Sequence, residues 1–300
     1  MLPASRSRLA AMATFFLFAS VGDAVAQSSV VADKRYSQVA TALQKLIQHE
    51  IREKQLPGFS IALVDDQQIV WAQGFGFADA DNKTPATAET AYRVGSVSKL
   101  YTAIGIMQQV ERGYLNLDTP VSEYLPGFHP ANPFHKPITL RELMSHRAGL
   151  VREPPVGSYF DSSQPALAAV VDSLNSTQLV YEPGTHAKYS NAGDAVDGRV
   201  LEVVTKQPYT QYLQDSVLKP LQLDHSAFLP SPSIKSNSPR ATCGRTTAKC
   251  SKLLRLNSEL AQQAICIRPS SISRDSSVGS SLGGAGRMAR FLNRRLWHRC

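Results

Sequence analysis

The sequence predicts an α/β (α+β) fold, with an antiparallel sheet flanked by helices and an inserted helical lobe. Two observations carry this prediction. A helical pattern is followed at once by a β-hairpin pattern near the start of the chain. Five prolines between residues 120 and 137 then mark a long irregular crossover towards further helices. With 300 residues, the chain can form one large domain or a domain with an embedded second lobe.

The first elements follow from hydrophobic periodicity. Residues 32–53 are predicted to form a helix because five apolar residues share one face, namely Val39, Leu43, Leu46, Ile47 and Ile51. Residues 59–64 and 69–76 are predicted to form two strands on either side of the polar turn Asp65-Asp66-Gln67. This order favours a helix packed against an antiparallel sheet.

Three later features complete the predicted helices. An amphipathic run at residues 100–110 follows Ser96, so that a helix is expected to start near this serine. The helical lobe is expected to begin at Thr139, after the proline-rich crossover. Residues 192–204 are predicted to form another helix.

The segment Ser96-Val-Ser-Lys99 carries the first indication of chemistry. A serine and a lysine three residues apart at a helix start share one face. The positive end of the helix, with its free N–H groups, can stabilise an oxyanion, and a partly desolvated lysine can lose its proton and activate the hydroxyl. This pattern indicates the nucleophile of an acyl-enzyme serine hydrolase. The alternative is an N-capping serine beside a solvated lysine.

Two further segments give this pattern a context. Tyr189-Ser190-Asn191 lies downstream, and residues 139–150 (TLRELMSHRAGL) lie between the two sites. Together, in this order, they resemble the serine β-lactamase-related family of class C β-lactamases, D-Ala-D-Ala carboxypeptidases and related esterases. The resemblance covers about residues 27–236. It implies a β-lactamase/transpeptidase-like fold whose C-terminal strands are missing here.

The resemblance also implies roles for individual residues. Ser96 is the expected nucleophile, Lys99 and Tyr189 manage its proton, and Asn191 contacts the substrate amide or positions Lys99. The alternative for Tyr189 is a core tyrosine with a satisfied hydroxyl. No metal or cofactor is implied, and we expect a structural role for His146 and an exposed position for His186. The substrate, whether a β-lactam, a D-amino-acid peptide or a short ester, stays open.

The first 26 residues have the pattern of a signal peptide. Arg6 and Arg8 precede a mostly apolar run at residues 9–21, and Ala24-Val25-Ala26 is a cleavage site of the A-x-A type. The apolar run is too short for a spanning helix, so we expect no stable membrane span. The alternative is an uncleaved anchor. We therefore expect a periplasmic or secreted monomer that acts on a small-molecule or peptidoglycan-derived substrate.

Residues 237–300 differ from the rest of the chain. They hold ten Arg and two Lys against Glu259 and Asp275, and they contain all four cysteines. A basic tail could bind nucleic acid, and four cysteines could form disulfides. A third reading is that the tail is out of frame, because a shifted frame restores aromatic and acidic residues, removes the cysteines and contains the family-like turn P-A-G-x-x-Y-S. We prefer this third reading and expect no nucleic-acid partner.

The frame interpretation has a consequence for function. The family's third motif, a Lys or His followed by any residue and Gly, has no candidate after Tyr189. The sequence thus leaves two hypotheses: an exported serine hydrolase acting by acyl transfer, or an inactive truncated pseudoenzyme or non-catalytic peptidoglycan- or β-lactam-binding relative.

Overall fold

The computed structural model describes residue 30 and residues 32–158, 161, 163, 165–229 and 266–267. The predicted signal peptide lies outside these residues, as does the predicted tail apart from residues 266–267. Among the described residues, no helix is both long enough and apolar enough to cross a membrane.

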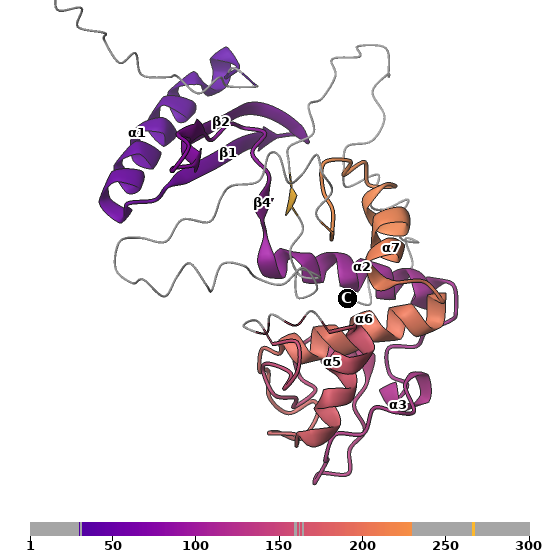
Figure 1. Ribbon diagram of the computed structural model, residues 1–300. Coiled ribbons are helices and arrows are strands. Elements are labelled where there is room, and N and C mark those ends of the chain that lie inside the picture. The colour runs from indigo at the N-terminus through magenta and orange to yellow at the C-terminus, as the bar shows by residue number, and fades with distance from the viewer. Residues whose placement is uncertain are drawn as a thin grey trace, which may run out of the picture.

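The N-terminal part contains a helix and a three-stranded antiparallel sheet (Figure 1). A 3₁₀ turn, Lys34–Tyr36, leads into α1, Ser37–Lys54, which is followed by β1, Gly58–Asp65, and β2, Gln68–Asp79. The two-residue strand β3, Thr84–Pro85, pairs with β2, so the strand order is β1-β2-β3. The predicted helix and hairpin are confirmed. The α-helix starts later than predicted because the side chain of Asp33 accepts a hydrogen bond from the Arg35 N–H and caps the 3₁₀ turn instead.

Helix α1 packs on the hairpin through a narrow apolar stripe. Ala40 and Ile47 are buried against Trp71 and Phe75, whose rings meet edge to face with centroids 6.5 Å apart. The predicted apolar face was wrong in part, because Val39 is 47% and Leu46 is 53% exposed. The two residues lie on the edge of the helix that turns away from the sheet, and the small side chain of Ala40 takes the contact instead.

A second segment leads from the sheet to the candidate nucleophile. The short strand β4, Tyr92–Arg93, pairs antiparallel with β5, Cys266–Ile267. It is followed by a 3₁₀ turn, Gly95–Val97, which runs directly into α2, Ser98–Glu111. Most of α2 is buried, including Tyr101, Ile104 and Ile106.

The rest of the described chain forms a helical lobe. Thr139 caps α4 with a capping box, in which its side chain and that of Glu142 each bond the other's backbone N–H. A helix therefore begins at the predicted position, but the lobe itself begins earlier than predicted, with α3. The elements of the lobe are α3 (Val121–Tyr124), α4 (Leu140–Met144), α5 (Leu167–Ser173), a 3₁₀ turn (Leu174–Ser176), α6 (Asn191–Thr205), α7 (Tyr209–Leu213) and a π-helical turn (Gln214–Leu218).

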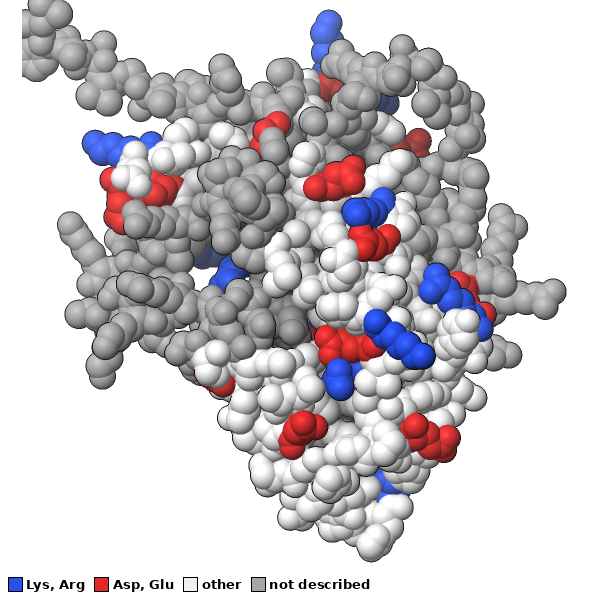
Figure 2. Space-filling model, turned by 45° about the vertical axis from the view of Figure 1, so that its right-hand side comes forward, with Lys and Arg blue, Asp and Glu red and all other residues white. Residues whose placement is uncertain are grey.

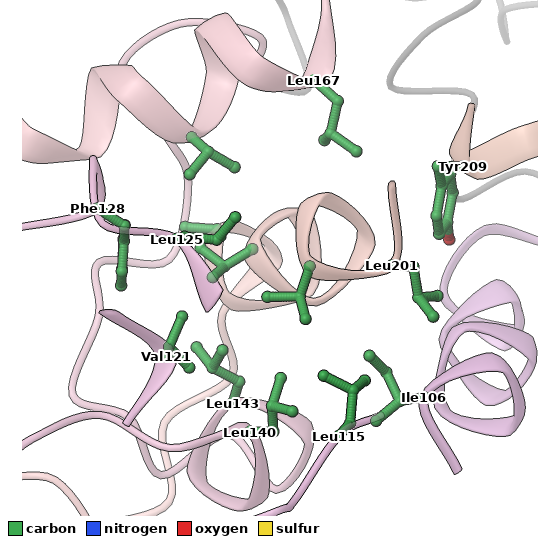
Figure 3. Close-up of a cluster of buried hydrophobic side chains, with 14 of the residues drawn as sticks. Ile106, Leu115, Val121, Leu125, Phe128, Leu140, Leu143, Leu167, Leu201 and Tyr209 are labelled. Atoms are coloured by element: carbon green, nitrogen blue, oxygen red, sulfur yellow. The ribbon is translucent and has the colours of Figure 1, made fainter. Parts of the chain in front are cut away.

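Helix α6 lies at the centre of the main core. Its residues Ala192, Val196, Val200 and Leu201 are fully buried. Figure 3 shows side chains from α2, α4, α6 and α7 pointing into this shared space. Gly105 of α2 permits a close approach, since a Cβ there would lie 3.0 Å from Leu201 Cδ1. The tight packing of α2 on α6 sets the distance between Lys99, on α2, and Asn191, at the start of α6.

The described surface carries charges of both signs. In the view of Figure 2, acidic and basic side chains are interspersed over the described residues, with no continuous patch of one sign. The described residues on this face thus present charges of both signs to the solvent.

We predict that Leu201→Ala lowers the free energy of unfolding by about 2–5 kcal/mol, because the change leaves a cavity between α6, α2 and α7. Val203→Ala is the matched control, since Val203 lies on the same helix but is 38% exposed. The control should change the free energy by no more than about 0.5 kcal/mol. Urea denaturation of the full chain measures both values, and equal losses in the two variants would contradict the assigned core.

Candidate active site

Ser96 and Lys99 lie one turn apart at the start of α2. Ser96 is in the 3₁₀ turn before the helix, and Gly95 adopts the positive φ of 54° that brings the chain round into this turn. The Oγ of Ser96 forms a short hydrogen bond with the Oη of Tyr189 and caps no backbone N–H. The Lys99 side chain is only 13% exposed. The alternative interpretation was an N-capping serine beside a solvated lysine. In the structure Ser96 caps no helix, and Lys99 is largely removed from solvent.

Tyr189 reaches Ser96 from the loop that precedes α6. Tyr189 is 36% exposed, so it is not a core tyrosine. Lys99 Nζ lies 5.2 Å from the centroid of its ring, and the Arg152 guanidinium carbon lies 5.5 Å from it. Two positive charges thus flank the tyrosine that contacts the serine.

Asn191 connects the lysine to the loop after α4. Lys99 Nζ donates a hydrogen bond of 3.0 Å to Asn191 Oδ1, and Asn191 Nδ2 donates one of 2.7 Å to Glu153 Oε1. This chain of bonds fixes which end of the amide faces the lysine. Of the two roles expected for Asn191, the geometry therefore favours positioning Lys99.

Hydrogen bonds of Ser190 and Asn191 hold the start of α6 against the loop that follows α4. Ser190 caps the helix by accepting from the Gly193 N–H at 2.9 Å, and its hydroxyl donates to the Val151 carbonyl at 2.7 Å. The Asn191 N–H donates to the Arg152 carbonyl at 2.7 Å. Tyr189 and Asn191, on either side of this cap, are thus held in fixed positions.

His146, for which the sequence predicts a structural role, lies within the candidate site. Its ring lies 4.6 Å from that of Tyr189, and its Nδ1 accepts a long hydrogen bond of 3.4 Å from the Ser190 N–H. Burial, helped by the charge of Lys99, lowers the pKa of His146. A neutral ring suits an Nδ1 that accepts a hydrogen bond. His186 is exposed, as predicted, and stacks on Tyr181.

Two aspartates that the sequence analysis missed lie behind Lys99. Asp194 Oδ2 is 3.8 Å from Lys99 Nζ, and Asp197 follows one turn later on α6. Asp197 is 3% exposed, and its Oδ1 has no hydrogen-bond partner within the described structure. Burial, with a smaller contribution from Asp194, raises the pKa of Asp197 well above its ordinary value. Their spacing on one helix face was the only signal in the sequence.

A small cavity of mixed polar and apolar lining lies beside these groups. Its volume is about 40 Å³, and its lining includes Lys99, Thr102, Asp194 and Asp197. The described residues contain no group of three or more His, Cys, Asp or Glu that could hold a metal ion.

Comparison with known proteins identifies the family. The family model described as Beta-lactamase matches residues 43–296, and the chain therefore belongs to the beta-lactamase family. The match extends beyond Ser236, where the sequence analysis ended the resemblance. Protein flp from Staphylococcus aureus (strain MW2) is 30% identical over 187 residues, which are 62% of this chain and 38% of flp.

Solved structures agree with this fold. EstCE1, described as a hydrolase with promiscuous acyltransferase activity, has a TM-score of 0.65 and 26% identity, covering 78% of this chain and 71% of EstCE1. The beta-lactamase/D-alanine carboxypeptidase from Yersinia pestis has a TM-score of 0.61 and 23% identity, covering 75% of this chain and 63% of that one. The fold is β-lactamase/transpeptidase-like.

We predict that Asp197→Asn removes a pH-dependent loss of stability. The pKa of Asp197 is raised on folding from its ordinary 3.8, so its contribution to stability is present at low pH and is lost as the pH rises through the folded value. The variant should resemble the parent near pH 4 and be more stable than the parent at pH 8. Urea unfolding at both pH values tests this, and parallel pH dependences would contradict it.

Proposed function

We propose that this protein is an exported serine hydrolase that acts by acyl transfer on an amide or ester. The observation that carries the proposal is the direct hydrogen bond between Ser96 Oγ and Tyr189 Oη, with Lys99 and Asn191 beside it. A serine in hydrogen-bond contact with a possible proton acceptor, which is itself positioned by a third group, is the usual arrangement of an activated nucleophile.

The proposed reaction has two halves. Ser96 Oγ bonds to the substrate carbonyl carbon, the carbonyl electron pair moves to oxygen, and the Ser96 proton passes to the Tyr189–Lys99 pair. The tetrahedral intermediate then collapses, the bond to the amine or alcohol breaks, and the pair returns the proton to this leaving group. Water releases the acyl group by the same steps. The Ser96 N–H, at the positive end of α2, would donate to the oxyanion.

The substrate class follows from the family and stays broad. β-Lactams, D-amino-acid peptides and short esters all present a carbonyl that such a serine can attack. The predicted signal peptide supports a periplasmic or secreted protein, where a peptidoglycan-derived substrate is accessible. We propose that the protein acts there as a monomer, without metal or cofactor.

Substitution of the nucleophile gives the first test. Ser96→Ala should abolish covalent labelling by a fluorophosphonate, because no other group replaces Oγ. The variant should stay folded, since loss of a serine at a helix start costs at most about 2 kcal/mol. Ser122→Ala, at an exposed serine of α3, is the control and should label like the parent. Labelling of Ser96→Ala at the parental rate would exclude Ser96 as the nucleophile.

The proton-handling pair gives the second test. Lys99→Ala and Tyr189→Phe should each reduce the labelling rate by about 10²–10⁴-fold. The double variant should lose little more than the worse single variant, because the two groups act as a unit. A time course of labelling, quenched at intervals and read out on gels or by mass spectrometry, measures all three rates. Fully multiplicative losses would show that the two residues act independently.

A second candidate function is an inactive or non-catalytic relative. One edge of β1 has no partner strand among the described residues, and Phe59 and Val64 of β1 are 38% and 57% exposed. An open edge with exposed apolar residues is unusual in a complete sheet. We propose that residues 237–300 are out of frame and that in-frame strands would cover this edge.

The nucleotide sequence downstream of codon 236 tests the frame proposal. Restoring one base near codon 237 should carry the reading past residue 300 into a Lys- or His-x-Gly motif and should increase Ser96 labelling. An early stop codon in the corrected frame, or full activity of the chain as written, would contradict the proposal and favour a genuine basic tail.

A further inference from the structure

The environment of Lys99 suggests a role for the two aspartates behind it, and this inference rests on the function proposed above. The Lys99 side chain is 13% and that of Asp194 is 9% exposed, with 3.8 Å between Nζ and Oδ2. A charged amine so far removed from water is costly unless an opposite charge lies nearby. Asp194 is the carboxylate in that position.

Asp197 and the cavity supply an independent observation. The Oδ1 of Asp197 is buried and has no hydrogen-bond partner among the described residues, although a buried polar atom normally has one. Asp197 lines the cavity of about 40 Å³ together with Asp194, Lys99 and Thr102. A cavity of this volume has room for one water molecule, and its lining offers Asp194, Asp197 and Thr102 as hydrogen-bond partners for it.

Every element packed around Lys99 contributes to its electrostatic surroundings. The loop after α4 contributes His146, whose lowered pKa favours the neutral ring. The loop before α6 contributes Tyr189, beside which Arg152 adds a positive charge. Glu153 accepts a hydrogen bond from Asn191 and so reaches Lys99 only through that amide. Among the described residues, Asp194 on α6 is the acid that forms an ion pair with Lys99 Nζ.

We propose that Asp194 is a positioning residue that holds Lys99 as an ammonium ion facing Asn191 and Tyr189, supported by Asp197 through a water molecule in the cavity. The ammonium ion then stabilises negative charge as it develops at Ser96 Oγ and Tyr189 Oη.

The first experiment measures the pH profile of fluorophosphonate labelling of the full chain between pH 5 and 10. Asp194→Asn keeps the shape of the side chain and removes its charge. The limb of the profile that depends on the charge of Lys99 should move to lower pH by about one unit. Asp172→Asn, at an exposed position on α5, is the control and should superimpose on the parent. A uniformly lower rate with an unshifted limb would overturn the proposal.

The second experiment needs no catalytic activity. Amine-reactive esters modify the neutral form of lysine, so at pH 8 Asp194→Asn should raise the modification rate of Lys99 by up to about tenfold relative to exposed Lys45 on α1. Asp194→Glu keeps the charge and should retain the slow parental rate. Asp194→Ser, which is smaller and also neutral, gives the same comparison should the Asn variant not fold.

The two experiments separate the two proposals. If neither the parent nor the frame-restored chain is labelled, while Lys99 reacts faster in the neutral variants, the hydrolase is rejected and the role of Asp194 is kept. A labelled parent with an unchanged Lys99 rate in a folded neutral variant would reject the role of Asp194 and keep the hydrolase.

Discussion

The partly buried ammonium group of Lys99 is the constraint on which the rest of the site depends. A charge at 13% exposure needs polar partners at fixed positions, and both of them come from the first turn of α6. Asn191 supplies an oxygen at 3.0 Å and Asp194 a carboxylate at 3.8 Å. Helix α6 must therefore begin where it does, and Ser190 ensures this by capping it and bonding the Val151 carbonyl.

Helix α6 contributes both to the hydrophobic core and to the candidate active site. Four residues of α6 are fully buried, and Gly105 lets α2 approach Leu201 closely. A core substitution that moved α6 away from α2 would therefore shift Asn191 and Asp194 away from Lys99. Tyr189 is held separately, by the ring of His146 and by the loop that ends at the Ser190 cap. The packing of the core thus determines the positions of the groups around Lys99, and the loops determine the position of Tyr189.

The sequence predicted the parts of the fold that depend on local patterns. The α1–hairpin order and the helix after Ser190 follow from periodicity, and the helix that begins after Thr139 follows from the end of the proline-rich crossover. The buried face of α1 was wrong at Val39 and Leu46, because periodicity alone does not show how narrow the contact with a small sheet is. Asp194, Asp197 and Glu153 were missed for a related reason. Each acts through a residue on another segment, and nothing local distinguishes Asp194 and Asp197 from acids on a solvated helix face.

The burial of Asp197 distinguishes this site from an ordinary core. A buried carboxyl oxygen without a partner destabilises the folded state, and an apolar residue of similar size would fit between α2 and α6 at lower cost. Local violations of good packing are expected where function requires them. Here the violation lies one helical turn from the counter-ion of Lys99 and on the wall of the same cavity. The burial of Asp197 therefore destabilises the fold at the place where the charge of Lys99, next to the candidate nucleophile, requires polar groups in the interior.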